Sequence, residues 1–206
     1  MADLRFETAV SPKFSRIVGI DEAGRGALAG PVVAAAVLLP LHNEVAMGKL
    51  TAVNDSKQLS PKKRDIFYDL ILEHALAFGV GMESAAVVDE FGIIQATKLA
   101  MKTAVYQISP APDYLLIDGR IRLSFLNIPQ QSIIRGDSKS LSIAAASIIA
   151  KVTRDRVMVE MGALYPIYGF AQHKGYGTQM HRDVIGVHGA CLIHRQTFAP
   201  IRQPLL

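Results

Sequence analysis

The sequence predicts an α/β domain, in which helices flank a β-sheet. Short apolar runs rich in β-branched residues, typical of buried strands, recur along the chain, and longer stretches with helix-capping residues lie between them. The 206 residues, 50% of them hydrophobic, suffice for one substantial core. We therefore expect a single domain over residues 14–200, preceded by a loose N-terminal arm over residues 1–13.

The first half of the chain is expected to begin with two buried strands. Residues 17–20 and 32–39 are apolar runs that predict them, and the short connection favours an antiparallel start to the sheet. Ser60 followed by Pro61 is an N-cap with proline at the first helical position, so a helix is predicted over residues 61–74. The other elements expected here are a loop over residues 41–51, a third strand over 75–82, a short helix capped by Ser84 and a longer helix over 92–108.

The second half is expected to add two strands and one long helix. Residues 114–117 and 132–134 are apolar and read as strands. Either Ser138 or Ser140 caps a helix that runs to about residue 161. Several alanines in the first half of this helix allow it to lie close against the sheet.

Composition excludes some classes of protein. The net charge of +4 permits a nucleic-acid partner without establishing one. Because Cys191 is the only cysteine, no internal disulfide and no cysteine zinc cluster can form. The longest apolar runs, residues 27–40 and 143–150, are shorter than the roughly 18 residues of a membrane span. With no apolar leader near the N-terminus, we expect a cytoplasmic protein that does not bind membranes.

Two adjacent carboxylates, Asp21 and Glu22, follow the first predicted strand, and a glycine-rich turn follows them. Like charges at a partly buried strand end repel each other, and a divalent cation would relieve the repulsion. This pattern favours a metal site. Solvated acids at the end of a strand are the simpler alternative. A third alternative, a dinucleotide site of the G-x-G-x-x-A type, is disfavoured because Gly30 and Pro31 would break the helix it needs.

The later strands repeat the pattern. Asp118 follows residues 114–117, and Asp137 follows residues 132–134 after a glycine. Ligands in open α/β sheets bind outside the carboxyl ends of the strands, so the four acids converge if these strands are neighbours. Ligation by oxygen alone selects Mg²⁺ or Mn²⁺ rather than zinc.

Taken together, these motifs resemble bacterial ribonuclease HII, in the family's order and over nearly the whole chain. The segments that carry the resemblance are Asp21-Glu22-Ala23-Gly24-Arg25-Gly26, Asp55-Ser56-Lys57-Gln58-Leu59, Leu116-Ile117-Asp118-Gly119, Gly136-Asp137-Ser138-Lys139, residues 145–156 and His173-Lys174-Gly175-Tyr176-Gly177-Thr178. The resemblance implies a ribonuclease H-like mixed five-stranded sheet flanked by helices, with a small C-terminal helical and loop region. It also implies a monomeric endonuclease that cleaves RNA in RNA–DNA hybrids and at single ribonucleotides in duplex DNA.

The resemblance assigns roles to individual residues. It makes Asp21, Glu22, Asp118 and Asp137 the catalytic acids, which hold Mg²⁺ or Mn²⁺, two ions in the substrate complex. The remaining assignments are substrate contacts: Gly24, Arg25 and Gly26 to the 2′-OH at the RNA–DNA junction, Tyr176 to the following deoxyribose, and Lys57 to a phosphate.

Two rival functions and several residues stay open at this stage. The chain could be a catalytically silent nucleic-acid-binding module, although clustered acids facing phosphates argue against it. It could also be another metal nuclease, which would share the acids but not the turn. His181 and His188 are expected to lie on the surface of a helix or to take part in its packing. His173 could touch substrate. Asp155 is expected to form an ion pair on the long helix.

Overall fold

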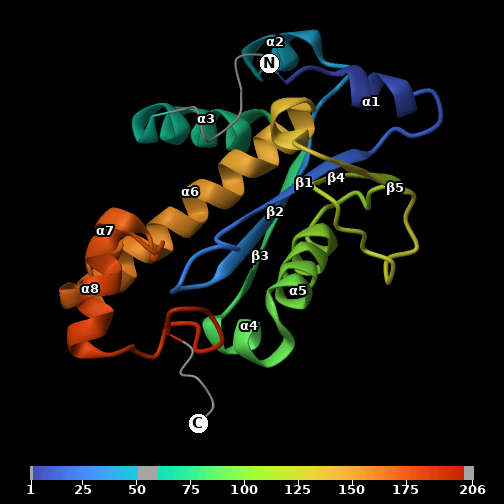
Figure 1. Ribbon diagram of the computed structural model, residues 1–206. Coiled ribbons are helices and arrows are strands. Elements are labelled where there is room, and N and C mark those ends of the chain that lie inside the picture. The colour runs from blue at the N-terminus through green and yellow to red at the C-terminus, as the bar shows by residue number, and fades with distance from the viewer. Residues whose placement is uncertain (1, 51–59, 202–206) are drawn as a thin grey trace.

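The computed structural model describes residues 2–50 and 60–201, which form a mixed sheet with helices on both faces (Figure 1). Within these residues the sheet has five strands in the order β3-β2-β1-β4-β5. The strands are β1 (Ile17–Ala23), β2 (Val32–Leu38), β3 (Ala77–Glu83), β4 (Tyr114–Asp118) and β5 (Gln130–Ile133). The first three pair antiparallel, and β4 and β5 continue parallel to β1. The predicted α/β fold and its antiparallel start are confirmed.

Side-chain caps mark the start of several helices. The side chains of Ser60 and Ser84 accept hydrogen bonds from backbone N–H groups of the first turns of α3 and α4. Ser140, the second of the two candidate caps, begins the long helix α6. The helices are α1 (Arg5–Val10), α2 (Glu44–Leu50), α3 (Pro61–His74), α4 (Ala85–Phe91), α5 (Ile93–Tyr106), α6 (Leu141–Leu164), α7 (Phe170–His173) and α8 (Gln179–His188), with 3-10 turns η1 (Gly136–Ser138) and η2 (Pro166–Tyr168). Among the described helices, none combines the length and apolarity that crossing a membrane requires.

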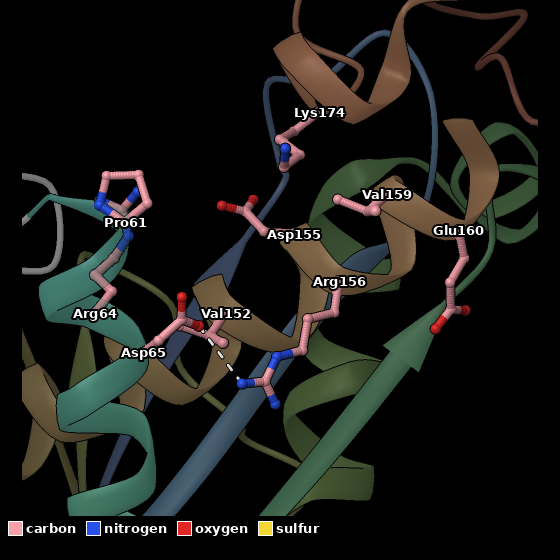
Figure 2. Close-up of a pocket in the computed structure, with 9 residues that line it drawn as sticks. All are labelled: Pro61, Arg64, Asp65, Val152, Asp155, Arg156, Val159, Glu160 and Lys174. Carbon is pink, nitrogen blue, oxygen red and sulfur yellow. Dashed lines mark hydrogen bonds and ion pairs between the residues drawn. The ribbon is translucent and has the colours of Figure 1, made fainter. Parts of the chain in front are cut away.

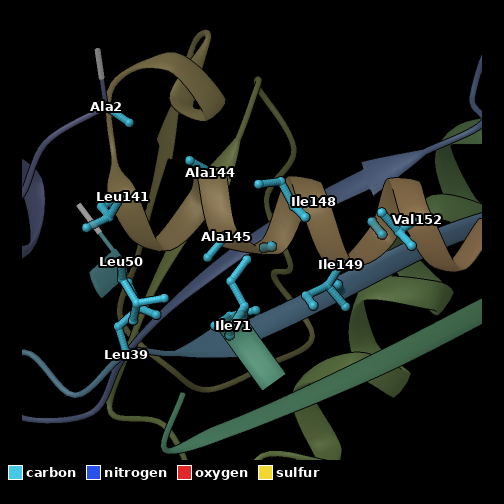
Figure 3. Close-up of a cluster of buried hydrophobic side chains, with 14 of the residues drawn as sticks. Ala2, Leu39, Leu50, Ile71, Leu141, Ala144, Ala145, Ile148, Ile149 and Val152 are labelled. Carbon is cyan, nitrogen blue, oxygen red and sulfur yellow. The ribbon is translucent and has the colours of Figure 1, made fainter. Parts of the chain in front are cut away.

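Alternation along β2 divides the core into two layers. Ala35 and Val37 face α6 and α3, and Ala34 and Ala36 face α5 on the opposite side of the sheet. Figure 3 shows the first layer, in which the apolar face of α6 packs over the sheet beside α3. Because both faces are covered, β2 is buried along its whole length, as its continuous apolar sequence predicts.

The backbone of α6 touches β1 at Gly19. A Cβ on Gly19 would overlap the backbone of Ser142 and Ile143, so only glycine allows this approach. Side chains two residues apart share a face of a strand, which places Asp21 on this same side, facing α6 further along the helix. The close approach therefore determines which part of α6 lies beside Asp21.

The loose arm expected over residues 1–13 is wrong for α1, and the loop expected over residues 41–51 is wrong for α2. Glu7 of α1 is buried, and its Oε1 accepts hydrogen bonds from the Ser140 hydroxyl (2.7 Å) and the Ser142 N–H (2.9 Å) at the start of α6. The carboxylate lies at the positive end of a long helix, where a negative charge is stabilising. In α2, Asn43 accepts from the Ala46 N–H, and Met47 and Leu50 enter the core.

We predict that Glu7→Ala destabilises the protein by about 1–3 kcal/mol, because it leaves the Ser140 hydroxyl and the Ser142 N–H buried without an acceptor. Urea unfolding followed by circular dichroism measures the change. Thr8→Ala, an exposed change on the same helix, is the control and should stay within about 0.5 kcal/mol of the parent. Equal stability of the two variants would show that α1 does not support the start of α6.

Candidate active site

Asp21 is a buried carboxyl group among like charges. Its side chain is 3% exposed, its Oδ1 accepts from the Glu22 N–H (2.7 Å), and it accepts a hydrogen bond from the Ser147 hydroxyl of α6. Burial, and then the charges of Glu22 and Asp118, raise the pKa of Asp21 well above its usual value. The ionised form of Asp21 is therefore unfavourable unless a cation lies beside it; without one, the protonated form is favoured.

Asp21 and Glu22 are expected from the sequence to follow the first strand, but the structure places both residues within β1. β1 continues through Asp21 and Glu22 to Ala23, still paired with β2. What ends there is the parallel ladder with β4, whose last pair is Ile20 with Ile117. Asp21 and Asp118 are each the next residue, so the point where two strands separate brings them together.

Asp118 also holds Asp137 in place. The Asp118 Oδ1 accepts from the Gly136 N–H (2.6 Å) and the Asp137 N–H (3.4 Å), which fixes η1 against the end of β4. Arg135, with φ of 57°, turns the chain into η1. Asp137 is therefore buried within a 3-10 turn and is not the strand-end residue that the sequence analysis expects. Asp21 thus interacts with Glu22 and Asp118, and Asp118 in turn binds the backbone of Asp137.

The donor atoms of these four residues are of the type that a hard divalent cation prefers. Their donor atoms are all carboxylate oxygens, which Mg²⁺ and Mn²⁺ prefer. The repulsion around Asp21 is the liability that a cation removes. In the part of the chain that the structure describes, no three His, Cys, Asp or Glu side chains are close enough to hold one ion as they stand.

The glycine turn (residues 24–30) follows β1 directly, and its first two glycines differ. Gly24 has a φ of +92°, and a Cβ there would overlap the side chain of Arg154. The φ of Gly26 lies outside the left-handed range, and no atom lies within 4 Å of the place of its Cβ. The fold thus explains Gly24, whereas the space above Gly26 is open. Arg25 extends from between them and pairs with Glu22, its Nη1 2.9 Å from Oε1.

Tyr176 lies beside α6 near this turn. Its ring centroid is 5.6 Å from the Lys151 Nζ and 5.2 Å from the Arg154 Cζ, and the ring is partly exposed. Lys151 pairs with Asp155 at 2.6 Å, which confirms the predicted ion pair of Asp155. Lys57, the predicted phosphate contact, lies outside the described residues.

Two buried arginines that the sequence analysis missed hold the glycine turn from behind. Arg154 donates to the carbonyls of Ala29, Pro31 and Lys174 at 2.9–3.1 Å. Arg195 donates to the carbonyls of Arg25 and Gly30 at 2.9–3.2 Å. Arginine is rarely fully buried, and nothing in the sequence pattern separates these two from exposed ones.

The histidines form a buried cluster rather than a metal motif. His181 and His194 are buried with their Nε2 atoms 3.0 Å apart, and the ring of His173 stacks on His181. Burial lowers the pKa of all three, that of His194 to about 4, so they are neutral at pH 7. The packing role expected for His181 is confirmed, and His188 is exposed.

A pocket of about 470 Å³ lies between α3 and α6 (Figure 2). Its polar rim includes the ion pair between Arg156 and Asp65. Of the predicted site residues that the structure describes, none lines it. The lining residues are Pro61, Arg64, Asp65, Val152, Asp155, Arg156, Val159, Glu160 and Lys174.

Three solved structures share this fold. Ribonuclease H2 from Pyrococcus horikoshii superposes with a TM-score of 0.77 at 23% identity, covering 91% of this chain and 96% of that one. The RNase HII of Archaeoglobus fulgidus, solved in complex with PCNA, has a TM-score of 0.77 at 26% identity and covers 93% and 98%. Bst-RNase HIII, solved in complex with Mn²⁺, has a TM-score of 0.73 at 20% identity and covers 90% and 68%.

Sequence comparison identifies the family. The family model described as Ribonuclease HII matches residues 18–200. The ribonuclease HII of Bacillus mycoides is 58% identical over 186 residues, which is 90% of this chain and 70% of that protein. That of Geotalea uraniireducens is 55% identical over 201 residues, or 97% and 90%. The chain therefore belongs to the ribonuclease HII family, and its activity is that of a ribonuclease H, an endonuclease that hydrolyses RNA.

Proposed function

We propose that the protein cleaves RNA in RNA–DNA hybrids and incises on the 5′ side of ribonucleotides embedded in duplex DNA. The products carry 3′-OH and 5′-phosphate ends, and the reaction starts the removal of misincorporated ribonucleotides. The observation that carries this proposal is the adjacency of two features where β1 separates from β4: the buried carboxyl group of Asp21 beside Glu22 and Asp118, and the turn after β1 with open space above Gly26.

The acids are proposed to hold the metal. Asp21, Glu22, Asp118 and Asp137 supply only oxygen donors, so Mg²⁺ or Mn²⁺, two ions when substrate is bound, is the expected cofactor. When bound, such ions polarise a phosphoryl oxygen and lower the pKa of water, which supplies the nucleophile and stabilises the leaving oxygen. The Mn²⁺ complex of Bst-RNase HIII, which has the same fold, is compatible with this choice.

The glycine turn and Tyr176 are proposed to recognise the junction. The 2′-OH is both a donor and an acceptor and distinguishes RNA from DNA. A sugar can approach the backbone closely at Gly26, because no side chain occupies that space. Tyr176 presents a ring on which the following deoxyribose packs. Arg25 belongs to the turn that contacts the 2′-OH, and Lys57 adds positive charge for a backbone phosphate.

Asp21→Asn should abolish cleavage and leave the protein folded. The amide has the same size and no charge, so the repulsion from Glu22 and Asp118 disappears. We expect the melting temperature without metal to stay unchanged or to rise by about 2–4 °C. Asp69→Asn, an exposed acid on α3, is the control and should keep both activity and melting temperature. A lower melting temperature with retained cleavage would show that Asp21 is structural.

Gly26→Ala and Gly24→Ala should separate substrate reading from folding. Gly26→Ala should keep its stability within about 0.5 kcal/mol, because its methyl group meets no atom. It should slow cleavage at an embedded ribonucleotide roughly tenfold or more, since the methyl group displaces the sugar. Gly24→Ala should instead lose about 1–3 kcal/mol of stability through strain at positive φ and overlap with Arg154. Full activity of Gly26→Ala would show that the glycine turn does not contact the 2′-OH.

A further inference from the structure

His194 and Arg195 are adjacent in the chain and both buried, 1% and 0% exposed. Neither can touch a substrate in this position. Their side chains extend toward different parts of the proposed recognition surface, which consists of the glycine turn and Tyr176. Because both residues are buried, each can act on that surface only through the groups it contacts.

Arg195 holds the glycine turn. Its Nη1 donates to the Arg25 carbonyl (2.9 Å), its Nε and Nη2 donate to the Gly30 carbonyl (3.2 and 3.0 Å), and its backbone N–H donates to the Leu28 carbonyl (2.9 Å). Burial lowers the pKa of Arg195 to about 10, which leaves the guanidinium charged at pH 7. Charge-assisted hydrogen bonds are stronger than neutral ones, so the turn is held firmly at both of its ends.

His194 reaches Tyr176 through His181, and the partners fix the direction of each hydrogen bond. The Cys191 N–H can only donate, so the His194 Nδ1 accepts it (2.9 Å) and the proton of His194 lies on Nε2. The Tyr176 carbonyl can only accept, so the His181 Nδ1 carries a proton and donates to it (3.0 Å). The His194 Nε2–H therefore donates to the His181 Nε2 (3.0 Å).

Tyr176 is thus held from both sides. The Gly175 carbonyl, in the peptide before Tyr176, accepts directly from the Leu28 N–H of the turn (2.8 Å). The Tyr176 carbonyl, in the peptide after it, accepts from the Thr178 N–H (2.8 Å) and from the His181 Nδ1 (3.0 Å), and His194 contacts the other nitrogen of the His181 ring. Since Gly177 follows and does not restrict the backbone, the second contact limits the direction in which the ring points.

We propose that His194 and Arg195 are positioning residues that set Tyr176 at a fixed distance and angle from the glycine turn. Given the proposed function, the turn reads the 2′-OH and Tyr176 reads the deoxyribose that follows. A junction substrate needs both contacts in register. Inside a long hybrid no deoxyribose follows the cut in the RNA strand, so cleavage there depends on the turn alone. Weakening the hydrogen bonds made by His194 or Arg195 should therefore slow cleavage at the junction more than cleavage of the hybrid.

The test compares two substrates: a DNA duplex with one ribonucleotide and an RNA–DNA hybrid. His194→Asn keeps an acceptor near the place of Nδ1 and loses the Nε2 donor, whereas His194→Gln places an amide N–H near that donor. We expect His194→Asn to lower the junction-to-hybrid ratio of single-turnover cleavage rates roughly tenfold. His194→Gln should restore most of the ratio. His188→Asn, an exposed histidine of α8, is the control and should leave the ratio unchanged.

Two outcomes overturn separate claims. If the parent protein fails to cleave the single-ribonucleotide duplex, the proposed function is wrong. If the parent cleaves it and His194→Asn slows both substrates equally, the residue is only structural and the inference is overturned. Should His194→Asn fail to fold, the same comparison applies to His181→Asn, which keeps a donor toward Tyr176 and loses the contact with His194.

Discussion

The close packing of α6 on β1 is the constraint on which the rest of the structure depends. Gly19 lets the backbone of the helix touch the strand, and from that point the two elements run past the site together. Ser147 then meets Asp21, Arg154 fills the space beside Gly24, and Met158 fills the space beside Gly30. Ser147, Arg154 and Met158 are spaced by seven and four residues, so they lie on one face of the helix. One helix face thus arranges both the acids and the turn.

Burying charge on both sides of this contact costs stability that function can explain. Asp21 is buried near Glu22 and Asp118, and Arg154 and Arg195 are buried with carbonyl groups as their hydrogen-bond acceptors. Buried charges are usually paired with an opposite charge or a metal. Under the proposed function a bound cation would be the complement of the acids, whereas backbone carbonyls already serve as acceptors for the two arginines. The proposed cation would relieve the repulsion that Glu22 and Asp118 exert on Asp21.

The sequence was sufficient where the physical cause is local. Ser60, Ser84 and the apolar run of β2 predict their elements because capping and burial on both faces need only neighbouring residues. It failed where the cause is distant: α1 depends on Glu7 meeting Ser140, 133 positions along the chain. The four candidate acids could be identified from the sequence. Their true place, at the separation of β1 from β4 and in a 3-10 turn, depends on strand register.

The buried side chains behind the site were the least predictable part. Arg154 is followed by Asp155 and Arg156, so the sequence alone suggests a surface residue, and its burial appears only when the glycine turn is folded beside it. His181 and His194 gain their roles only from main-chain groups that fix their protons. The motifs nevertheless include Arg154 and Tyr176, so the resemblance located this region without explaining how it is held.

The most direct measurement uses a DNA duplex with one ribonucleotide, a matched all-DNA duplex, and analysis of the product ends. The nucleotide upstream of the cut is deoxy, so no 2′-OH is available there to attack. The account predicts cleavage on the 5′ side of the ribonucleotide that needs Mg²⁺ or Mn²⁺, leaves 3′-OH and 5′-phosphate ends, and is absent from the all-DNA duplex. Cleavage that survives EDTA, or that falls on the 3′ side with a cyclic phosphate product, would contradict it.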